Sequence, residues 1–256
     1  MTGGGRGIGR AIAHRLARTG VAIGIVDLDG TTARAVANEI AIAGGRAVAD
    51  EITSAGGRAA SAAADVSDLD AVEAAVRAIA SALGPVDVLV NNAGWERLGL
   101  FVESDPALWD RLIAVNFRGV LNATRAVLPG MLERGRGRIV SISSDAGRVG
   151  STGEAVYSGC KAAIIGFSKA LAREVARKAV TVNVVCPGPA DTQLLADVMT
   201  GERGQKILAG MQRAIPLGRL AQPEDVAGAV AYLVSDEATY VTGQVVSVSG
   251  GLTMAG

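Results

Sequence analysis

Short apolar runs alternate along the chain with longer stretches in which apolar residues recur at helical spacing. The short runs predict buried β-strands at residues 21–26, 86–90, 138–142, 180–185 and 245–248. The longer stretches predict helices near residues 8–18, 31–43, 69–83, 107–133, 155–178 and 223–234. Alternating strands and helices imply right-handed crossovers, so we expect an α/β fold with a Rossmann-like, doubly wound parallel sheet. A chain of 256 residues suits a single domain of this kind, spanning residues 1–256.

Composition supports such a core and excludes several classes of function. Hydrophobic residues make up 49% of the chain and aromatic residues only 3%, so Ala, Val, Leu and Ile must pack the core, as they do where helices cover a parallel sheet. Lys+Arg and Asp+Glu both total 25, which leaves no net field to attract nucleic acid or an anionic membrane. No apolar run reaches the ~18 residues of a membrane span, and no signal segment opens the chain. We therefore expect a cytoplasmic protein without a nucleic-acid or membrane partner.

Metal-binding and nucleophilic residue types are scarce. Cys160 and Cys186 are the only cysteines, too few for a disulfide framework, and we expect Cys160 to be a small buried thiol. His14 is the only histidine, which excludes a Ser-His-Asp triad and leaves no cluster for a metal.

Glycines, hydroxyl groups and one tyrosine–lysine pair follow the ends of the predicted strands. Residues 2–9 are Thr-Gly-Gly-Gly-Arg-Gly-Ile-Gly, a loop that opens a helix and suits a pyrophosphate. Tyr157 and Lys161 are four residues apart, so on a helix the ammonium lies near the phenol and should lower the pKa of Tyr157 toward that of a general base. Because ligands bind at the carboxyl ends of such strands, these motifs indicate a dinucleotide site beside a positioned acid–base group.

Taken in order, these residues resemble the short-chain dehydrogenase/reductase family over nearly the whole chain. The resemblance rests on Thr-Gly-x-x-x-Gly-x-Gly at 2–9, Asp65-Val66, Asn-Asn-Ala-Gly at 91–94, Asn116, Ser144, Tyr157, Lys161, Pro-Gly-x-x-x-Thr at 187–192 and Gly250-Gly251. It implies an enzyme that transfers a hydride between a secondary alcohol and NAD. The alternative from another class is a non-catalytic dinucleotide-binding sensor, against which Ser144, Tyr157 and Lys161 argue.

The chain departs from the family in two places. In the family a β-strand leads into the glycine loop, whereas here the loop follows Met1 directly, so we expect the first strand to be missing and the neighbouring strand edges to be unpaired. A truncated or mis-assigned start explains this better than a natural variant of the sheet. The second departure is a 12-residue tandem repeat, in which residues 49–59 nearly copy residues 37–47. We expect it to lengthen the helix or to bulge at Gly44-Gly45, as a local insertion without chemistry.

The resemblance also implies a cofactor site along the strand ends. Asp27 ends a predicted strand, where its carboxylate can accept hydrogen bonds from an adenosine ribose and would repel a 2′-phosphate. Asp27 therefore favours NAD, although Arg6 is a residue that often accompanies NADP in this family. The expected cofactor-binding residues are Gly3, Arg6, Gly7, Ile8, Gly9, Asp27, Asp65, Val66, Asn92, Ala93, Gly94, Tyr157, Lys161, Pro187, Gly188, Ala190 and Thr192.

Four catalytic residues follow from the same resemblance. Tyr157 takes the alcohol proton as the hydride leaves, Ser144 hydrogen-bonds the reacting oxygen, and Lys161 lowers the pKa of Tyr157 and binds the nicotinamide ribose. Ser144 lies 13 residues before Tyr157, the family spacing, and is preferred to its neighbour Ser143. Asn116 is expected to hold a water that relays protons; on its residue type alone it is equally a buried asparagine that satisfies a helix kink.

Substrate specificity is expected to come from Trp95, Arg97, the loop at 145–154 and a lid at 189–216 with an amphipathic pattern. Trp95 and the loop most resemble 2-hydroxycyclohexanecarboxyl-CoA dehydrogenases. The expected alcohol is therefore a cyclic 2-hydroxyacyl-CoA thioester, with Arg97 and Arg148 as candidate partners of the CoA.

A 3-oxoacyl-carrier-protein reductase is the alternative enzyme, since such reductases share Gly-Phe-Ser-Lys at residues 166–169. The family further implies a homotetramer, assembled through the helices near 107–133 and 155–178 and the last strand.

Overall fold

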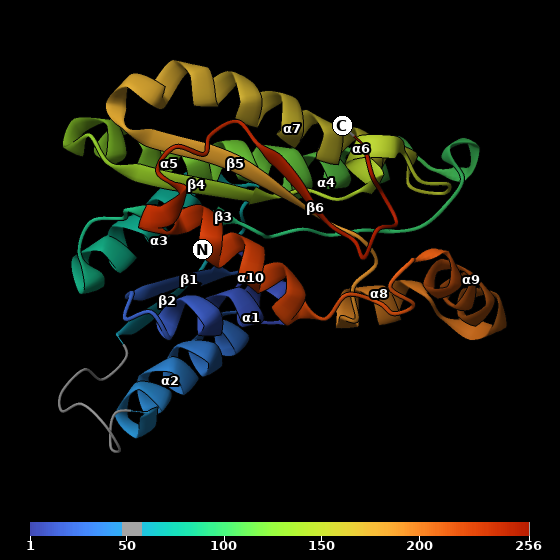
Figure 1. Cartoon of the computed structure of the whole chain (residues 1–256), viewed down its shortest axis with the longest axis horizontal. Helices are drawn as coiled ribbons and strands as arrows, with labels where there is room; N and C mark the ends of the chain where they lie inside the picture. The colour runs from blue at the N-terminus through green and yellow to red at the C-terminus, as the bar shows by residue number, and fades with distance from the viewer. Residues whose placement is uncertain (48–57, 256) are drawn as a thin grey trace.

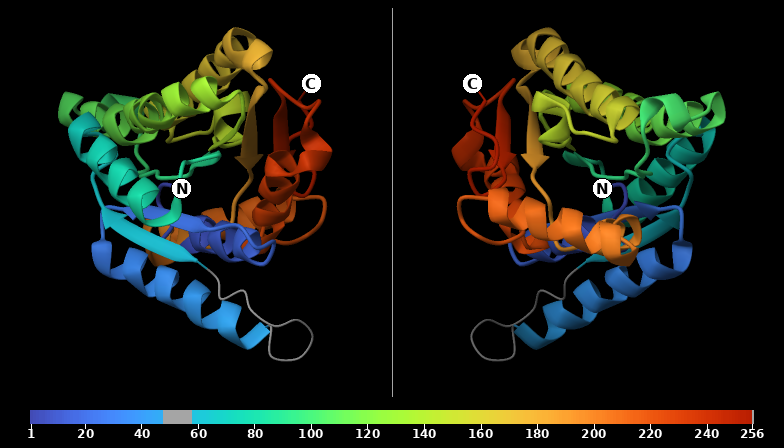
Figure 2. Two further views of the ribbon diagram at one scale, coloured as in Figure 1. Left: turned by 90° about the vertical axis from the view of Figure 1, so that its left-hand side faces the viewer. Right: turned by 90° about the vertical axis from the view of Figure 1, so that its right-hand side faces the viewer.

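The computed structural model describes residues 1–47 and 58–255, and in it parallel strands are enclosed by helices (Figures 1 and 2). The strands are β1 (Ile23–Asp27), β2 (Ala59–Ala63), β3 (Val88–Asn91), β4 (Gly137–Ile142), β5 (Val180–Pro187) and β6 (Val245–Val248). β1 pairs with β2, and β3, β4, β5 and β6 form a second sheet in that order, with every pair parallel. The predicted α/β fold with a parallel, doubly wound arrangement is confirmed.

The backbone of residues 1–3 lies between the two sheets. The Thr2 amide donates to the Val90 carbonyl (3.0 Å), and the Gly3 amide donates to the Val26 carbonyl (2.7 Å). The Val26 amide donates in turn to the Met1 carbonyl (2.9 Å). These few bonds connect β1 to β3, and the sheet is interrupted where the sequence predicts an interruption.

Helices cover both faces of the strands. They are α1 (Gly7–Ala17), α2 (Gly30–Ala47), α3 (Leu69–Leu83), α4 (Pro106–Ile113), α5 (Gly119–Arg134), α6 (Ala146–Val149), α7 (Ala155–Val175), α8 (Gln193–Val198), α9 (Gly201–Ala214) and α10 (Pro223–Val234). One apolar core joins α1, α2 and α10 to the strands, and a second joins α3, α5 and α7 to the other face (Figure 1). With both faces covered, β5 is buried along its whole length, as its valine-rich sequence predicts.

Short polar side chains fix where several helices begin. Asp68 accepts a hydrogen bond from the Ala71 amide at the start of α3, and Asp105 accepts one from the Leu108 amide at the start of α4. Thr192 caps α8 in the same way, so the first helix of the predicted lid begins next to a residue of the predicted cofactor site.

The structure differs from the predicted elements in three places. β2 was not predicted, because its sequence Ala-Ala-Ser-Ala-Ala lacks the β-branched residues typical of strands. The helix predicted at 107–133 is divided by a π-helical turn, Ala114–Arg118. The helix predicted at 31–43 continues through Gly44-Gly45 to Ala47, so the first copy of the repeat lengthens α2, while residues 49–57 of the second copy lie outside the described residues.

None of the helices in the described ranges is long and apolar enough to cross a membrane.

Candidate active site

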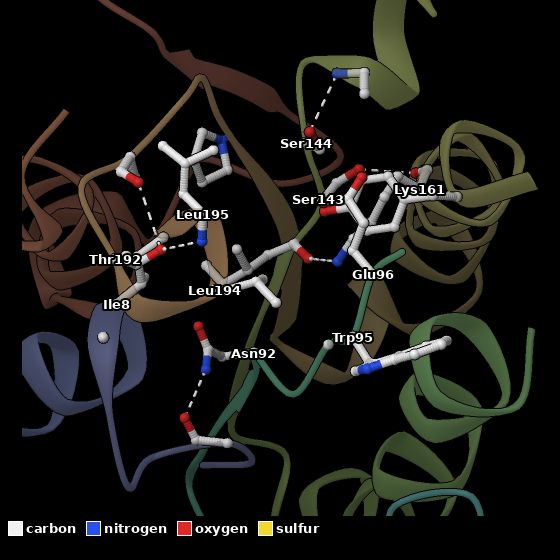
Figure 3. Close-up of a pocket in the computed structure, with 18 of the residues that line it drawn as sticks. Ile8, Asn92, Trp95, Glu96, Ser143, Ser144, Lys161, Thr192, Leu194 and Leu195 are labelled. Atoms are coloured by element: carbon white, nitrogen blue, oxygen red, sulfur yellow. Dashed lines mark hydrogen bonds between the residues drawn. The ribbon is translucent and has the colours of Figure 1, made fainter. Parts of the chain in front are cut away.

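A cavity of about 760 Å³ opens at the carboxyl ends of β1, β3, β4 and β5. Ser144 and every residue predicted to bind the cofactor line this cavity, although they come from all parts of the chain. In Figure 3, Ile8 and Thr192 lie on one side, and Glu96 and Lys161 lie on the other. The structure therefore brings the predicted dinucleotide and acid–base residues into one place.

The glycine loop is held against the segment that follows β3. Gly3 has a φ of 63°, and a Cβ there would lie 2.7 Å from the Ala93 Cα. A Cβ at Gly9 would lie 2.0 Å from the Gly3 carbonyl oxygen, and Asn92 Nδ2 donates to the same oxygen (2.8 Å). Only glycine permits this packing, which places the start of α1 at the cavity.

Asp27 ends β1 with its carboxylate directed at the loop. Its Oδ2 accepts a hydrogen bond from the Gly5 amide (2.9 Å), and its Oδ1 accepts one from the Asp29 amide (3.2 Å). Arg6 lines the same cavity with an exposed side chain. A glycine loop, a helix N-terminus and a carboxylate at this spacing fit the pyrophosphate and the ribose of a dinucleotide.

Ser144, Tyr157 and Lys161 meet at the end of β4 and on the first turns of α7. Ser144 Oγ accepts a hydrogen bond from the Ala146 amide (3.1 Å), and its hydroxyl lies near enough to the Tyr157 hydroxyl to lower the pKa of Tyr157. Lys161 Nζ donates to the Ile142 carbonyl (3.1 Å) and lies 5.4 Å from the centre of the Tyr157 ring. The helical spacing thus places phenol and ammonium on one face, as predicted.

Ser143 has a different role from its neighbour. Its side chain is buried, and its Oγ donates to the Lys161 backbone carbonyl (2.8 Å). This bond ties α7 to the end of β4, so Ser144 and not Ser143 is the serine beside the Tyr157 hydroxyl.

The electrostatic environment of Tyr157 differs from the one predicted. Burial raises the pKa of Tyr157 well above its usual value, and the carboxyl groups of Glu96 and Glu154 raise it further. Burial also lowers the pKa of Lys161 to about 8. The prediction that Tyr157 has a lowered pKa is wrong. Burial and the carboxyl groups of Glu96 and Glu154 raise the pKa instead.

Asn116 lies in the π-helical turn and is fully buried behind the cavity wall. Its Nδ2 donates to the Trp95 carbonyl (2.7 Å) and the Leu112 carbonyl (3.0 Å), and its Oδ1 accepts from the Trp95 amide (3.2 Å). The amide group therefore satisfies a helix irregularity and fixes the backbone of Trp95. Its predicted role in holding a water stays a prediction.

A family model described as Enoyl-(Acyl carrier protein) reductase matches residues 3–253. The chain belongs to the short-chain dehydrogenase/reductase family. It is 37% identical to a 3-oxoacyl-acyl-carrier-protein reductase of Escherichia coli (strain K12), over 99% of this chain and 96% of that protein. It is 41% identical to an acetoacetyl-CoA reductase of Allochromatium vinosum, over 99% of this chain and 97% of that protein.

A solved structure agrees with these relatives. It is the crystal structure of a 3-ketoacyl-(acyl-carrier-protein) reductase from Brucella melitensis complexed with NADH. The TM-score is 0.85 at 33% sequence identity, and the match covers 99% of this chain and 96% of that chain. The predicted resemblance to the short-chain dehydrogenase/reductase family is confirmed, and these relatives match the alternative substrate class, the 3-oxoacyl thioesters, better than the cyclic one.

Within this family member, the residues expected to shape substrate binding separate into two groups. Trp95, much of the loop at 145–154, and Leu194, Leu195, Met199 and Met211 of the lid line the cavity. Arg97 is exposed and does not line it. Arg148 does not line the cavity: its guanidinium donates to Ser247 Oγ (2.7 Å) and to the Ala255 carbonyl, and its role as a CoA partner stays a prediction.

Two charged cavity residues, Arg111 and Glu96, were missed by the sequence interpretation, and Glu154 was predicted only as the end of the loop at 145–154. Arg111 lies over the Trp95 ring (4.1 Å to the centroid), and Glu96 and Glu154 flank Tyr157. Glu96 directly follows Trp95 and Glu154 ends the specificity loop, so proximity to predicted residues was the available signal. Within the described ranges no group of His, Cys, Asp and Glu side chains is suited to hold a metal ion.

Proposed function

We propose that the chain is an NAD-linked oxidoreductase that interconverts β-oxoacyl and β-hydroxyacyl thioesters. The observation that carries the proposal is a cavity lined by Ser144, Tyr157, the glycine loop and Asp27, whose carboxylate binds the Gly5 amide. The relatives support the substrate class, since 3-oxoacyl-carrier-protein and acetoacetyl-CoA both carry an oxo group on the carbon β to a thioester. The NADH named in the Brucella melitensis complex supports the cofactor.

The chain's own groups supply the proton and the binding of the reacting oxygen. NAD, when bound along the glycine loop, supplies or accepts the hydride. The raised pKa keeps Tyr157 protonated near neutral pH, so its hydroxyl can donate a proton to the carbonyl oxygen of an oxoacyl substrate. Ser144 Oγ, which lies beside the Tyr157 hydroxyl, hydrogen-bonds the same oxygen as its charge changes. This favours reduction at neutral pH and oxidation at higher pH.

A cyclic 2-hydroxyacyl-CoA remains the second candidate substrate. The stack of Arg111 on Trp95 gives the cavity a flat wall suited to a ring, beside the loop at 145–154. A hydroxyl on ring carbon 2 is also β to the thioester carbonyl, so both candidates need the same chemistry at the same atoms.

A substrate panel tests the proposal. Acetoacetyl-CoA, a 3-oxoacyl-carrier-protein, cyclic 2-hydroxyacyl-CoA thioesters, the matching free acids and cyclohexanol are assayed with both NAD(H) and NADP(H). We expect β-oxoacyl thioesters to be reduced with the highest kcat/KM. Higher kcat/KM for the cyclic thioesters would select the second candidate, and preference for cyclohexanol would exclude both. Binding of NADH without any turnover would indicate the non-catalytic sensor.

We also propose that the chain forms a homotetramer through α4, α5, α7 and β6, as the family resemblance implies. Sedimentation equilibrium measures this directly, and a monomeric mass would contradict it. A cytoplasmic location stays a prediction.

A further inference from the structure

Two carboxyl groups face each other in the cavity wall beside Tyr157. Glu96 belongs to the segment that follows β3, and Glu154 immediately precedes α7. Their side chains lie within hydrogen-bonding reach of each other, and both act electrostatically on Tyr157. Figure 3 shows Glu96 on the same side of the cavity as Lys161.

The backbone holds the two segments in place. Asn116 binds both the amide and the carbonyl of Trp95, which fixes the residue before Glu96. The Gly99 amide donates to the Gly153 carbonyl (3.0 Å), which ties the segment that carries Glu96 to the loop that ends in Glu154. The pair is therefore a built feature of the cavity rather than a chance meeting of two mobile side chains.

The carboxyl groups of Glu96 and Glu154 can share one proton. Glu96 Oε1 is buried and no N–H or O–H group of the described residues donates to it, so a proton held between the carboxyl groups supplies the missing hydrogen bond. Burial, followed by Glu154, raises the pKa of Glu96 to about 9, although the positive charge of Lys161 opposes this. At neutral pH Glu96 therefore keeps a proton that it can share with Glu154.

Other charged groups reach the same space. Lys161 lies beneath the Tyr157 ring, and Arg111 lies over the Trp95 ring in the cavity wall. Burial lowers the pKa of Lys161 to about 8, so part of its charge is lost under mildly alkaline conditions. Both cations attract an anion, but the charges that act on Tyr157 itself are those of Glu96 and Glu154, so a negatively charged substrate is repelled where it reaches Tyr157.

We propose that Glu96 and Glu154 determine substrate specificity: sharing one proton, they keep a negative charge beside Tyr157, so that the cavity accepts uncharged thioesters and rejects the corresponding free acids. The inference rests on the proposed function, because it concerns the substrate of the same site. In a β-hydroxy acid the carboxylate is only two carbons from the reacting hydroxyl, so it must come close to the pair. In the thioester the same carbonyl carries no charge.

Kinetics with matched substrates test the specificity. The ratio of kcat/KM for 3-hydroxybutyryl-CoA to that for 3-hydroxybutyrate is measured with NAD near pH 7. Glu154→Gln removes the negative charge and should lower this ratio at least tenfold, about 1.4 kcal/mol. Glu96→Gln leaves the Glu154 carboxyl group in place and should keep the wild-type ratio. Glu103→Gln, on the exposed turn after Leu100, is the control and should behave as wild type.

The outcomes separate the two proposals. A ratio that changes less than twofold in Glu154→Gln overturns the specificity inference, even when the thioester is turned over normally. No turnover of any thioester by the wild type overturns the proposed function itself.

A stability measurement tests the shared proton without turnover. The pKa of Glu96 is raised from its ordinary 4.5 to about 9, so between these values the folded protein holds a proton that the unfolded chain has released. The wild type should therefore lose stability relative to Glu96→Gln as the pH rises from about 5 to about 8, measured by urea unfolding. Parallel pH dependence in the two proteins overturns the shared proton and the proposal with it.

Discussion

Removing a single hydroxyl group, that of Tyr157, tests the catalytic assignment. Tyr157→Phe removes the group that transfers the proton and leaves the ring in place, so turnover should fall to a few per cent or less while NADH binding persists. Fluorescence titration measures the binding, and steady-state kinetics measure the turnover. Lys161→Ala should impair both, because it removes an ammonium group that lies in the cavity beside Tyr157 and donates to the Ile142 carbonyl.

The neighbouring serines Ser143 and Ser144 provide a matched pair of variants for the same assignment. Ser144→Ala should lower kcat, whereas Ser143→Ala should act mainly on stability, because the Ser143 hydroxyl holds α7 against β4. A Tyr157→Phe variant with near wild-type kcat would show that another group transfers the proton.

Asp27 is a second single residue with a testable role, because its carboxylate is predicted to determine the choice of cofactor. Its carboxylate is held by the Gly5 amide at the place where the adenosine ribose is expected, so NAD should be preferred to NADP by at least tenfold, about 1.4 kcal/mol. Asp27→Ala should relax the preference, and the ratio of kcat/KM for the two cofactors measures it. Equal kcat/KM values for NAD and NADP in the wild type would mean that Arg6, which lines the same cavity, outweighs the carboxylate.

The π-helical turn between α4 and α5 shows how an element positions the site from behind. π-turns place one extra residue in a helix and are frequent at functional sites. Here the turn buries Asn116, whose side chain fixes Trp95 and thereby the start of the segment that carries Glu96.

Asn116→Ala should loosen this element. The Trp95 amide and two carbonyls lose their partner, so stability should fall by about 1–3 kcal/mol, and KM for the thioester should rise. Asn122→Ala, which removes a buried bond to the Val66 carbonyl (2.9 Å), is the matched control. It should lose stability and weaken cofactor binding, with little effect on KM for the substrate. Equal effects of both variants on that KM would contradict the positioning role.

At the scale of the whole molecule, the two cysteines report on global unfolding. Cys160 and Cys186 are free and buried, and burial raises the pKa of each thiol, that of Cys186 to about 11. The native protein should therefore show almost no reactive thiol near pH 8, and both should react after unfolding in guanidinium. A thiol-specific chromogenic reagent measures this, and one rapidly reacting native thiol would reveal local opening around α7 or β5.

The sequence by itself determined the elements whose signal is local. The valine-rich run of β5 predicts a strand that is buried at every residue. The apolar residues of α10 recur once per turn and predict a helix with one buried face. The glycines at 3 and 9 and the Tyr157–Lys161 spacing also predicted cofactor and acid–base residues, since each motif carries its own geometric requirement. All these residues line one cavity, as the topology of a parallel sheet demands.

Tertiary structure alone decided the features that depend on partners distant in sequence. The alanine-rich β2 becomes a strand because β1 pairs with it, and Arg148 is engaged because Ser247 lies beside it. Glu96 and Glu154 are separated by 58 residues, yet they meet beside Tyr157 and raise its pKa. Burial and charge depend on everything packed around a group, so a spacing of four residues could predict where Tyr157 lies but not how tightly it holds its proton.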